Sequence, residues 1–383
     1  MMRAFITNTA KFLPNDPVDN DQIESILGMI GGKPSRSRKL VLRSNGILQR
    51  YYAIDPQNGL ATHTNAEMTA GAVRRLFDSE AHLSDIDCLV SGTSMPDQTM
   101  PGHAVMVHGE LQNPPCEVVS TAGICLSGMS SLKYAFLGVK SGEFQTAVST
   151  GSELASLLLQ ARHFEAESGR KLEALERRPE IAFDKDFLRW MLSDGAGAFR
   201  IEPHPIQRTD QPVFEIEWID IASYANELST CMYAGANKLK DDSLKGWCLY
   251  NQQELISQSV LNVKQDVKLL NEKIVPITLT RSLEKSIRKH GLQADKIDWF
   301  LPHISSMYFY DRVYEALAEM DFEITKERWF TNLDRFGNTG SASIYIMLDE
   351  LARSGSLKSG QKLLCFVPES GRFSSAFMLL TIV

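Results

Sequence analysis

The sequence lacks several features that would each indicate a class of protein. Its 383 residues contain no basic block and carry a formal net charge of −7, so nothing suggests nucleic acid or an anionic membrane as a partner. No apolar run reaches the roughly 18 residues that a membrane-spanning helix needs. The N-terminal stretch MMRAFITNTAKFLPND turns polar too early for a signal peptide. Together these absences predict a soluble, cytoplasmic protein.

Paired cysteines and metal-ligand spacings are also absent. The cysteines are scattered and form no CxxC pair, which argues against a zinc knuckle or a disulfide framework. They are Cys88, Cys116, Cys125, Cys231, Cys248 and Cys365. No cluster of carboxylates and histidines has metal-ligand spacing, so we expect no metal. Most of the cysteines are expected to be small buried hydrophobic residues.

Two pairs of segments in the chain resemble each other. In the first pair, which begins at His63 and at Thr278, an amphipathic helix and a polar link precede an apolar strand. The second pair begins at Gly123 and at Gly337. In each of these segments a Gly/Ser-rich turn leads into a helix of small residues, an SG break and an apolar strand. The sequence therefore predicts a duplicated α/β unit.

The offset between the repeated segments supports the duplication. It is 211 positions from Ile86 to Ile297 and 213 positions from Cys125 to Asn338. We expect two halves, residues 1–208 and 209–383, each with a mixed sheet and packed about a pseudo-twofold axis. The boundary lies in the polar, Pro-rich stretch EPHPIQRTDQP.

Cys125 lies where a strand is expected to end and a helix to begin, among Gly123, Ser127 and Gly128. Unsatisfied amides and the helix dipole favour an anion at that position, which lowers the pKa of a thiol. The position therefore favours a thiolate. The alternative is a buried structural cysteine.

His303 and Asn338 are expected to meet Cys125 in one cleft. The pseudo-symmetry places Asn338 opposite Cys125, and the strand WFLPHIS ends beside the same helix with His303 at its tip. A thiolate could attack a thioester carbonyl, while imidazole and carboxamide donate hydrogen bonds to the developing charge. The alternatives are a structural strand-end histidine and a helix-capping asparagine.

Six ordered motifs resemble those of the β-ketoacyl-acyl-carrier-protein (ACP) synthase III branch of the thiolase superfamily. They are GICLSGM around Cys125, Gly151-Ser152-Glu153, SDGAGAF, Pro302-His303, GNTGSAS from Gly337, and loosely PESGRFSSAFMLLTIV. The resemblance covers most of the chain. It implies a thiolase-like fold in which the two halves form a layered α-β-α-β-α sandwich.

By that resemblance Cys125 is the acylated nucleophile, and His303 and Asn338 stabilise the carbanion of a malonyl-type or β-ketoacyl extender. The backbone amides of Cys125 and Gly371 would form an oxyanion hole. Thr99, Met100 and Phe373 would line an acyl tunnel, the first two from a loop that reaches the partner subunit. The resemblance implies acyl-CoA or acyl carrier protein as substrates, no further cofactor, and a homodimer or a heterodimer with a paralogue.

Two departures from the family pattern favour a specialised enzyme over plain fatty-acid initiation. Ile304-Ser305-Ser306 replaces Gln-Ala-Asn after the histidine, and Glu369-Ser370-Gly371-Arg372 replaces a glycine-rich turn. One candidate is the branch that joins two thioester chains into precursors of dialkylresorcinols. Alternatives are an acyltransferase that passes the acyl group from Cys125 to an alcohol or amine, and a non-catalytic partner subunit.

Two segments have no counterpart in the repeat, residues 163–190 and 229–255. Such insertions usually cover a site in layered α/β folds. The second contains Lys238, Lys240 and Lys245, which could meet an acidic carrier protein or a CoA phosphate, or could form an ordinary solvated face.

Overall fold

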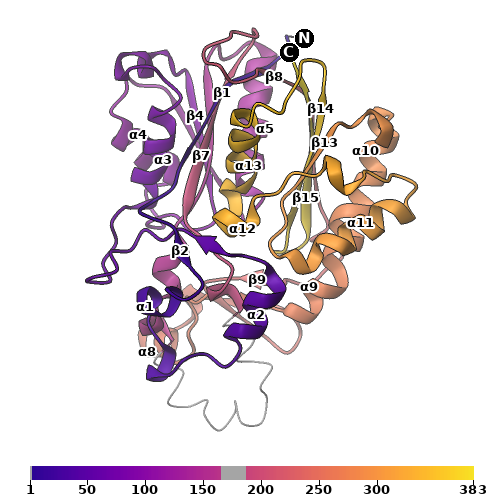
Figure 1. Ribbon diagram of the computed structural model, residues 1–383. Coiled ribbons are helices and arrows are strands. Elements are labelled where there is room, and N and C mark those ends of the chain that lie inside the picture. The colour runs from indigo at the N-terminus through magenta and orange to yellow at the C-terminus, as the bar shows by residue number, and fades with distance from the viewer. Residues whose placement is uncertain (1, 165–186) are drawn as a thin grey trace.

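The chain is described by a computed structural model that covers residues 2–164 and 187–383. Within these ranges, a nine-stranded sheet has the strand order β13-β14-β15-β8-β1-β7-β6-β4-β5 (Figure 1). Its strands are β1 Phe5–Phe12, β4 Cys88–Thr93, β5 Glu117–Ala122, β6 Ala147–Glu153, β7 Gly195–Glu202, β8 Phe214–Ser223, β13 Trp299–Pro302, β14 Lys362–Glu369 and β15 Ser374–Ile382. Shorter strands are β2 Val18–Asp19, β3 Gln49–Arg50, β9 Met232–Tyr233, β10 Ala236–Lys238, β11 Leu244–Gly246 and β12 Lys264–Gln265.

The strand order repeats between the two parts of the chain. The order β4-β6-β7-β1 in the first part matches β13-β14-β15-β8 in the second, with β5 added at one edge. β4 pairs with β5 and β6 in parallel and β13 pairs with β14 in parallel, whereas the other neighbours are antiparallel. The parts join through β1 and β8, at the pairs Phe5↔Glu215 and Ile6↔Phe214. The division expected between residues 208 and 209 falls in the connection from β7 to β8.

Helices separate the two parts of the sheet and cover their outer faces (Figure 1). The helices are α1 Ile23–Leu27, α2 Arg38–Asn45, α3 Asn65–Arg74, α4 His103–Leu111, α5 Ser127–Ser141, α8 Gln252–Ser257, α9 Val267–Lys273, α10 Ser282–His290, α11 Tyr310–Glu319, α12 Leu333–Phe336 and α13 Ser343–Arg353. Helices α5 and α13 share a central core with both parts of the sheet. A second core lies under α3 and α4, and a third under α10 and α11. The layered α-β-α-β-α arrangement expected from the sequence is confirmed.

Small residues bring the central helix α5 close to the second half of the chain. A Cβ atom on Gly128 would lie 2.4 Å from the carbonyl oxygen of Ser341, a distance that no side chain tolerates. The hydroxyl of Tyr345 donates a 2.8 Å hydrogen bond to the carbonyl oxygen of Gly128. This close packing places the first turn of α5 beside the segment that follows Asn338.

The second insertion, residues 229–255, and several short elements such as α1 and α2 lie at one end of the sandwich (Figure 1). Residues 165–186 of the first insertion are outside the described part of the chain.

Between α9 and α10 the chain forms a π-helical segment, Ile274–Arg281, where the repeat predicts an ordinary helix from Thr278. Pro276 lacks a backbone N–H and cannot continue a regular α-helical ladder there. None of the helices in residues 2–164 and 187–383 is both long enough and apolar enough to span a bilayer.

Candidate active site

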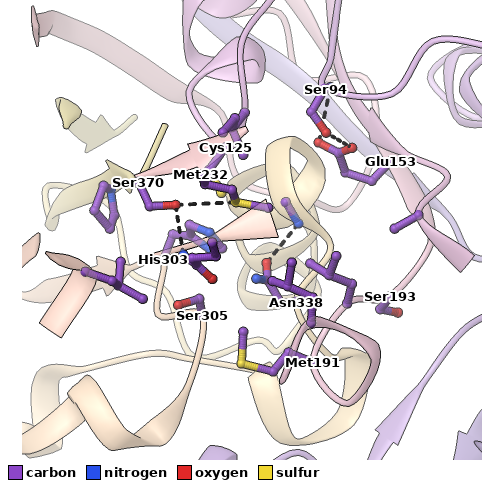
Figure 2. Close-up of a pocket in the computed structure, with 18 of the residues that line it drawn as sticks. Ser94, Cys125, Glu153, Met191, Ser193, Met232, His303, Ser305, Asn338 and Ser370 are labelled. Atoms are coloured by element: carbon purple, nitrogen blue, oxygen red, sulfur yellow. Dashed lines mark hydrogen bonds between the residues drawn. The ribbon is translucent and has the colours of Figure 1, made fainter. Parts of the chain in front are cut away.

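A cavity of about 60 Å³ lies where the two halves meet, and it contains all three residues proposed for catalysis (Figure 2). Cys125 comes from the turn before α5, His303 from the end of β13, and Asn338 from the turn before α13. The other lining residues are Ser94, Met95, Ile124, Glu153, Ala155, Leu188, Met191, Leu192, Ser193, Met232, Gln265, Leu270, Ile274, Ser305, Gly340, Pro368 and Ser370. Apolar side chains form most of the wall, so the cavity suits an apolar group.

Cys125 stands in a tight turn between β5 and α5. Within this turn the Ser127 hydroxyl donates a 2.7 Å hydrogen bond to the carbonyl oxygen of Ile124. The pKa of the Cys125 thiol is raised, first by burial of the thiol and then by the carboxylates of Glu369 and Glu153. The sequence-based expectation of a thiolate is therefore wrong for the resting site. The helix dipole does act on the thiol, but burial and two nearby carboxylates outweigh it.

His303 is held by the backbone and leaves its imidazole pointing into the cavity. The backbone N–H of His303 donates a 2.7 Å hydrogen bond to the carbonyl oxygen of Phe366 on β14, and this bond extends the parallel β13–β14 pairing. The side chain is 3% exposed, and its Nε2 atom is buried without a hydrogen-bond partner among the described residues. Burial lowers the pKa of His303 to about 4, so the ring is neutral at pH 7.

The low pKa of His303 predicts a loss of stability on acidification. As the pH falls below about 6.5, the unfolded chain gains a proton on this histidine, whereas the folded chain gains it only near pH 4. His303 alone should therefore lower the free energy of unfolding by up to about 3 kcal/mol between pH 7 and pH 4. Urea unfolding over this range should show a shallower pH dependence for His303→Gln than for the wild type.

A matched control isolates that contribution. His204→Gln removes an exposed histidine and should keep the pH dependence of the wild type. Buried His103, whose pKa is also lowered to about 4, contributes in the same direction in all three proteins and cancels in the comparison. Equal slopes for wild type and His303→Gln would contradict the buried, neutral state of His303.

Asn338 is oriented by its own turn. Its Oδ1 atom accepts a 3.0 Å hydrogen bond from the N–H of Gly340, while its Nδ2 atom has no partner among the described residues (Figure 2). Gly337 before it has a φ of +67°, and a Cβ atom there would lie 2.9 Å from the Cβ of Ser193. Glycine thus permits the turn that presents the Asn338 amide to the cavity. The side chain caps this turn and can also donate into the site.

Glu153 ends β6 and forms another wall of the cavity (Figure 2). The hydroxyl of Ser94 donates a 2.5 Å hydrogen bond to its carboxyl group, and the N–H of Ser341 donates one of 3.0 Å. Burial raises the pKa of Glu153 to about 7, although these hydrogen bonds oppose the shift. Glu153 therefore links the end of β6 to the segment that follows Asn338 and can hold or release a proton near neutral pH.

Apart from Cys125, the residues expected in the oxyanion hole and the acyl tunnel do not line the cavity. Ser370 rather than Gly371 lines the cavity, and the Gly371 carbonyl accepts a 2.8 Å hydrogen bond from the N–H of Cys231. Met100 is 83% exposed in the single chain and Thr99 is also exposed. Phe373 is fully buried in the core under α10 and α11 and does not line the cavity.

Part of the cavity wall comes from the second half's unrepeated segments. Met232 lies within the expected insertion, and Gln265 and Ile274 follow it. The Ser370 hydroxyl accepts a 3.3 Å hydrogen bond from Gln265 and contacts the sulfur of Met232 (Figure 2). These residues were missed because their apolar and amide side chains carry no motif.

The three lysines of the insertion do not line the cavity. Lys238 lies 3.4 Å from carboxylate oxygens of both Asp242 and Asp266. Lys245 lies 4.0 Å from the ring centroid of Tyr250. Lys240 is exposed. The expected contact with an anionic substrate or carrier stays a prediction for all three lysines.

The arrangement has the parts needed for acyl transfer. A thiol, a neutral imidazole and a carboxamide face one apolar cavity, and the last two groups each have an unpartnered nitrogen among the described residues. Such nitrogens can donate to an oxygen on which negative charge develops. Within the described residues, no three His, Cys, Asp or Glu side chains gather in a way that could hold a metal ion.

Comparisons with known proteins show what the chain is similar to. Residues 287–379 match the family described as 3-oxoacyl-[acyl-carrier-protein (ACP)] synthase III C terminal. Across 367 residues the chain is 24% identical to the β-ketoacyl-[acyl-carrier-protein] synthase III of Xanthomonas oryzae pv. oryzae, with 94% of this chain and 92% of the relative covered.

Solved structures share the whole fold. The tetronic acid condensing enzyme AbyA1 superposes with a TM-score of 0.74 at 17% identity, over 99% of each chain. A cysteine-to-serine variant of Xanthomonas campestris OleA, solved with bound lauric acid and lauroyl-CoA, superposes with a TM-score of 0.72 at 18% identity, again over 99% of each chain. These likenesses confirm the thiolase-like fold expected from the sequence motifs.

Proposed function

We propose that this chain forms a carbon–carbon bond between two thioesters, through an acyl group held on Cys125. Its similarity to the β-ketoacyl-ACP synthase III family supports this proposal. One observation carries the proposal. Cys125, His303 and Asn338, from separate parts of the sequence, line one cavity in which both nitrogen donors lack a partner among the described residues.

In the first step the Cys125 sulfur attacks the carbonyl carbon of an acyl thioester of CoA or of a carrier protein. The bond to the leaving sulfur breaks, an acyl-Cys125 thioester forms, and the proton of the thiol ends on the released thiol. Because the resting thiol is neutral, this proton must leave during the attack. The neutral imidazole of His303 and the carboxyl group of Glu153 line the same cavity and are the candidate bases.

In the second step a malonyl-type or β-ketoacyl thioester becomes a carbon nucleophile by losing CO₂ or a proton. Its enolate oxygen accepts hydrogen bonds from His303 Nε2, in the tautomer that carries the proton there, and from Asn338 Nδ2. The carbanion attacks the acyl carbonyl, the new C–C bond forms, and Cys125 leaves as a thiolate, which takes up the proton lost by the extender or, after decarboxylation, a proton from solvent. Backbone amides at the Cys125 turn and at Ser370 are the candidate donors to the acyl oxygen, with Ser370 in the position first expected for Gly371.

The wall of the cavity favours an apolar acyl group. Leu188, Leu270 and Ile274 contribute branched side chains, and Met95 and Met232 contribute flexible ones. The cavity volume of about 60 Å³ is too small for a long chain in the resting state. Methionine side chains rearrange at low cost, so we propose that they move to admit the acyl group.

Two finer features belong to the same proposal. We propose that the second substrate is itself a β-ketoacyl chain, as in the dialkylresorcinol-forming branch, because the turns after His303 and around Glu369 depart from the family pattern.

We also propose a homodimer. Its support is that β5 is an edge strand of the sheet and that Met100 projects from the surface of the single chain.

Product analysis tests the proposed reaction. The purified chain is incubated with an acyl-CoA and with a malonyl or β-ketoacyl thioester that carries ¹³C at the nucleophilic carbon. We expect a product in which this carbon is bonded to the acyl carbonyl, as detected by mass spectrometry. An acyl ester or amide as the only product, with the ¹³C extender recovered intact, would favour the acyltransferase alternative.

A further inference from the structure

A carboxylate from the other half of the chain accepts hydrogen bonds from the turn that carries Cys125. Oε2 of Glu369, the last residue of β14, accepts hydrogen bonds from the N–H groups of Ile124 at 2.9 Å and of Leu126 at 3.1 Å. These two amides flank Cys125 on either side. Leu126 is the N-cap of the 15-residue helix α5, and Ile124 lies two residues before it, at an end where unpaired amides and the helix dipole attract an anion.

The surroundings of the Glu369 carboxylate are shaped to hold it. A Cβ atom on Gly123 would lie 3.3 Å from Oε2 and would crowd the carboxylate, whereas one on Gly371 would lie 3.4 Å from Oε1, an ordinary contact distance. No lysine, arginine or histidine of the described residues forms an ion pair with Glu369. Nearby Arg372 instead donates its Nε–H to the carbonyl oxygen of Leu228. Backbone amides are therefore the main partners of this charge.

The carboxylate acts on the thiol as well as on the turn. An unoccupied helix N-terminus would favour a thiolate at Cys125, whereas a negative charge on the same amides cancels that effect. The titratable groups around the thiol are Glu369 from β14, Glu153 from β6 and His303 from β13. The pKa of the Cys125 thiol is raised by burial and then by Glu369, in agreement with the geometry.

We propose that Glu369 is a positioning residue that clamps the nucleophile turn across the two halves and keeps the Cys125 thiol protonated in the empty site. The inference rests on the proposed role of Cys125 as the acylated nucleophile. The cost of the clamp is a less reactive thiol, and its benefit is a fixed sulfur position and protection from alkylation and oxidation before a thioester enters.

Alkylation of Cys125 tests the clamp without requiring turnover. The full chain is treated with iodoacetamide from pH 6 to pH 10, and Cys125 is followed by peptide mass spectrometry because Cys248 is exposed and will also react. Glu369→Gln keeps the shape and one acceptor oxygen but removes the charge. Its alkylation midpoint should fall by about one pH unit or more. Glu369→Asp, which stays charged, should keep a midpoint near that of the wild type.

A matched control uses another carboxylate at a helix N-terminus. Glu67 accepts a hydrogen bond from the N–H of Thr64 at the start of α3, outside the cavity, and Glu67→Gln should leave the Cys125 midpoint unchanged. An equal midpoint for Glu369→Gln and wild type overturns the inference, whether or not the wild type condenses thioesters. A lowered midpoint in a chain that no thioester acylates supports the clamp and overturns the proposed function instead.

Discussion

Replacement of Cys125 by serine should abolish acylation of the chain and lower turnover at least about 10³-fold. A serine hydroxyl at this position is a far weaker nucleophile than a thiol, and no residue of the turn is arranged as a dedicated base for it. Intact-mass spectrometry after incubation with acyl-CoA or acyl-ACP should show one acyl adduct on the wild type and none on Cys125→Ser.

The exposed cysteine offers the matched control for this measurement. Cys248 lies on the surface outside the cavity, and Cys248→Ser should acquire the acyl group as the wild type does. A persistent adduct on Cys125→Ser would show that another residue carries the acyl group, and the proposed mechanism would then be wrong.

Removal of the Asn338 amide should separate the two halves of the reaction. One well-placed donor to a developing oxyanion contributes about 10²- to 10³-fold to a rate, so Asn338→Ala should lower condensation by that factor. The acyl-Cys125 adduct should still form, because attack by the thiol does not need the enolate site. Single-turnover product analysis beside intact-mass spectrometry measures both steps in the same sample.

A second substitution distinguishes the amide's chemical role from its role in the turn. Asn338→Asp keeps an oxygen that can accept from the N–H of Gly340 but loses the Nδ2 donor. Condensation by Asn338→Asp should therefore be as slow as by Asn338→Ala, while its melting temperature should stay closer to that of the wild type. Near-normal condensation by Asn338→Asp would show that the residue serves only as a cap.

Internal repetition made the meeting of Cys125, His303 and Asn338 in one cavity predictable from the sequence. The near-constant offset placed Cys125 and Asn338 at equivalent turns, and the strand before His303 is the counterpart of the strand that ends at Thr93. The layered fold followed from the same repeat, since two copies of one α/β unit must bury their inner helices against each other. The structure shows these residues in one cavity, as expected, although their catalytic roles remain predictions.

The protonation state of Cys125 could not be predicted in the same way. A local rule, that a helix N-terminus lowers the pKa of a thiol, was applied without knowledge of what occupies that terminus. Glu369 reaches the turn only because the β14–β15 connection folds back beside α5. Its effect depends on a contact between residues hundreds of positions apart, which no local pattern reveals.

The wall of the cavity was unpredictable for a different reason. Met232 comes from an insertion that has no counterpart in the repeat, and Leu270 and Ile274 lie between that insertion and the repeated segment that begins at Thr278. Ile274 also begins a π-helical segment, whose extra residue per turn shifts every side chain after it relative to an α-helix. A register change of this kind alters which residues face the substrate.

The division of the site between the two halves has a consequence for the newly synthesised chain. Cys125 leaves the ribosome well before His303, Asn338 and Glu369. Until these residues are made, the Cys125 turn lacks its hydrogen bonds to Glu369, and the cavity lacks part of its wall. The nascent thiol then lacks the neighbours that surround it in the folded chain. The cavity is therefore complete only when the last strands have joined the sheet, and a shortened chain carries Cys125 without the residues that face it.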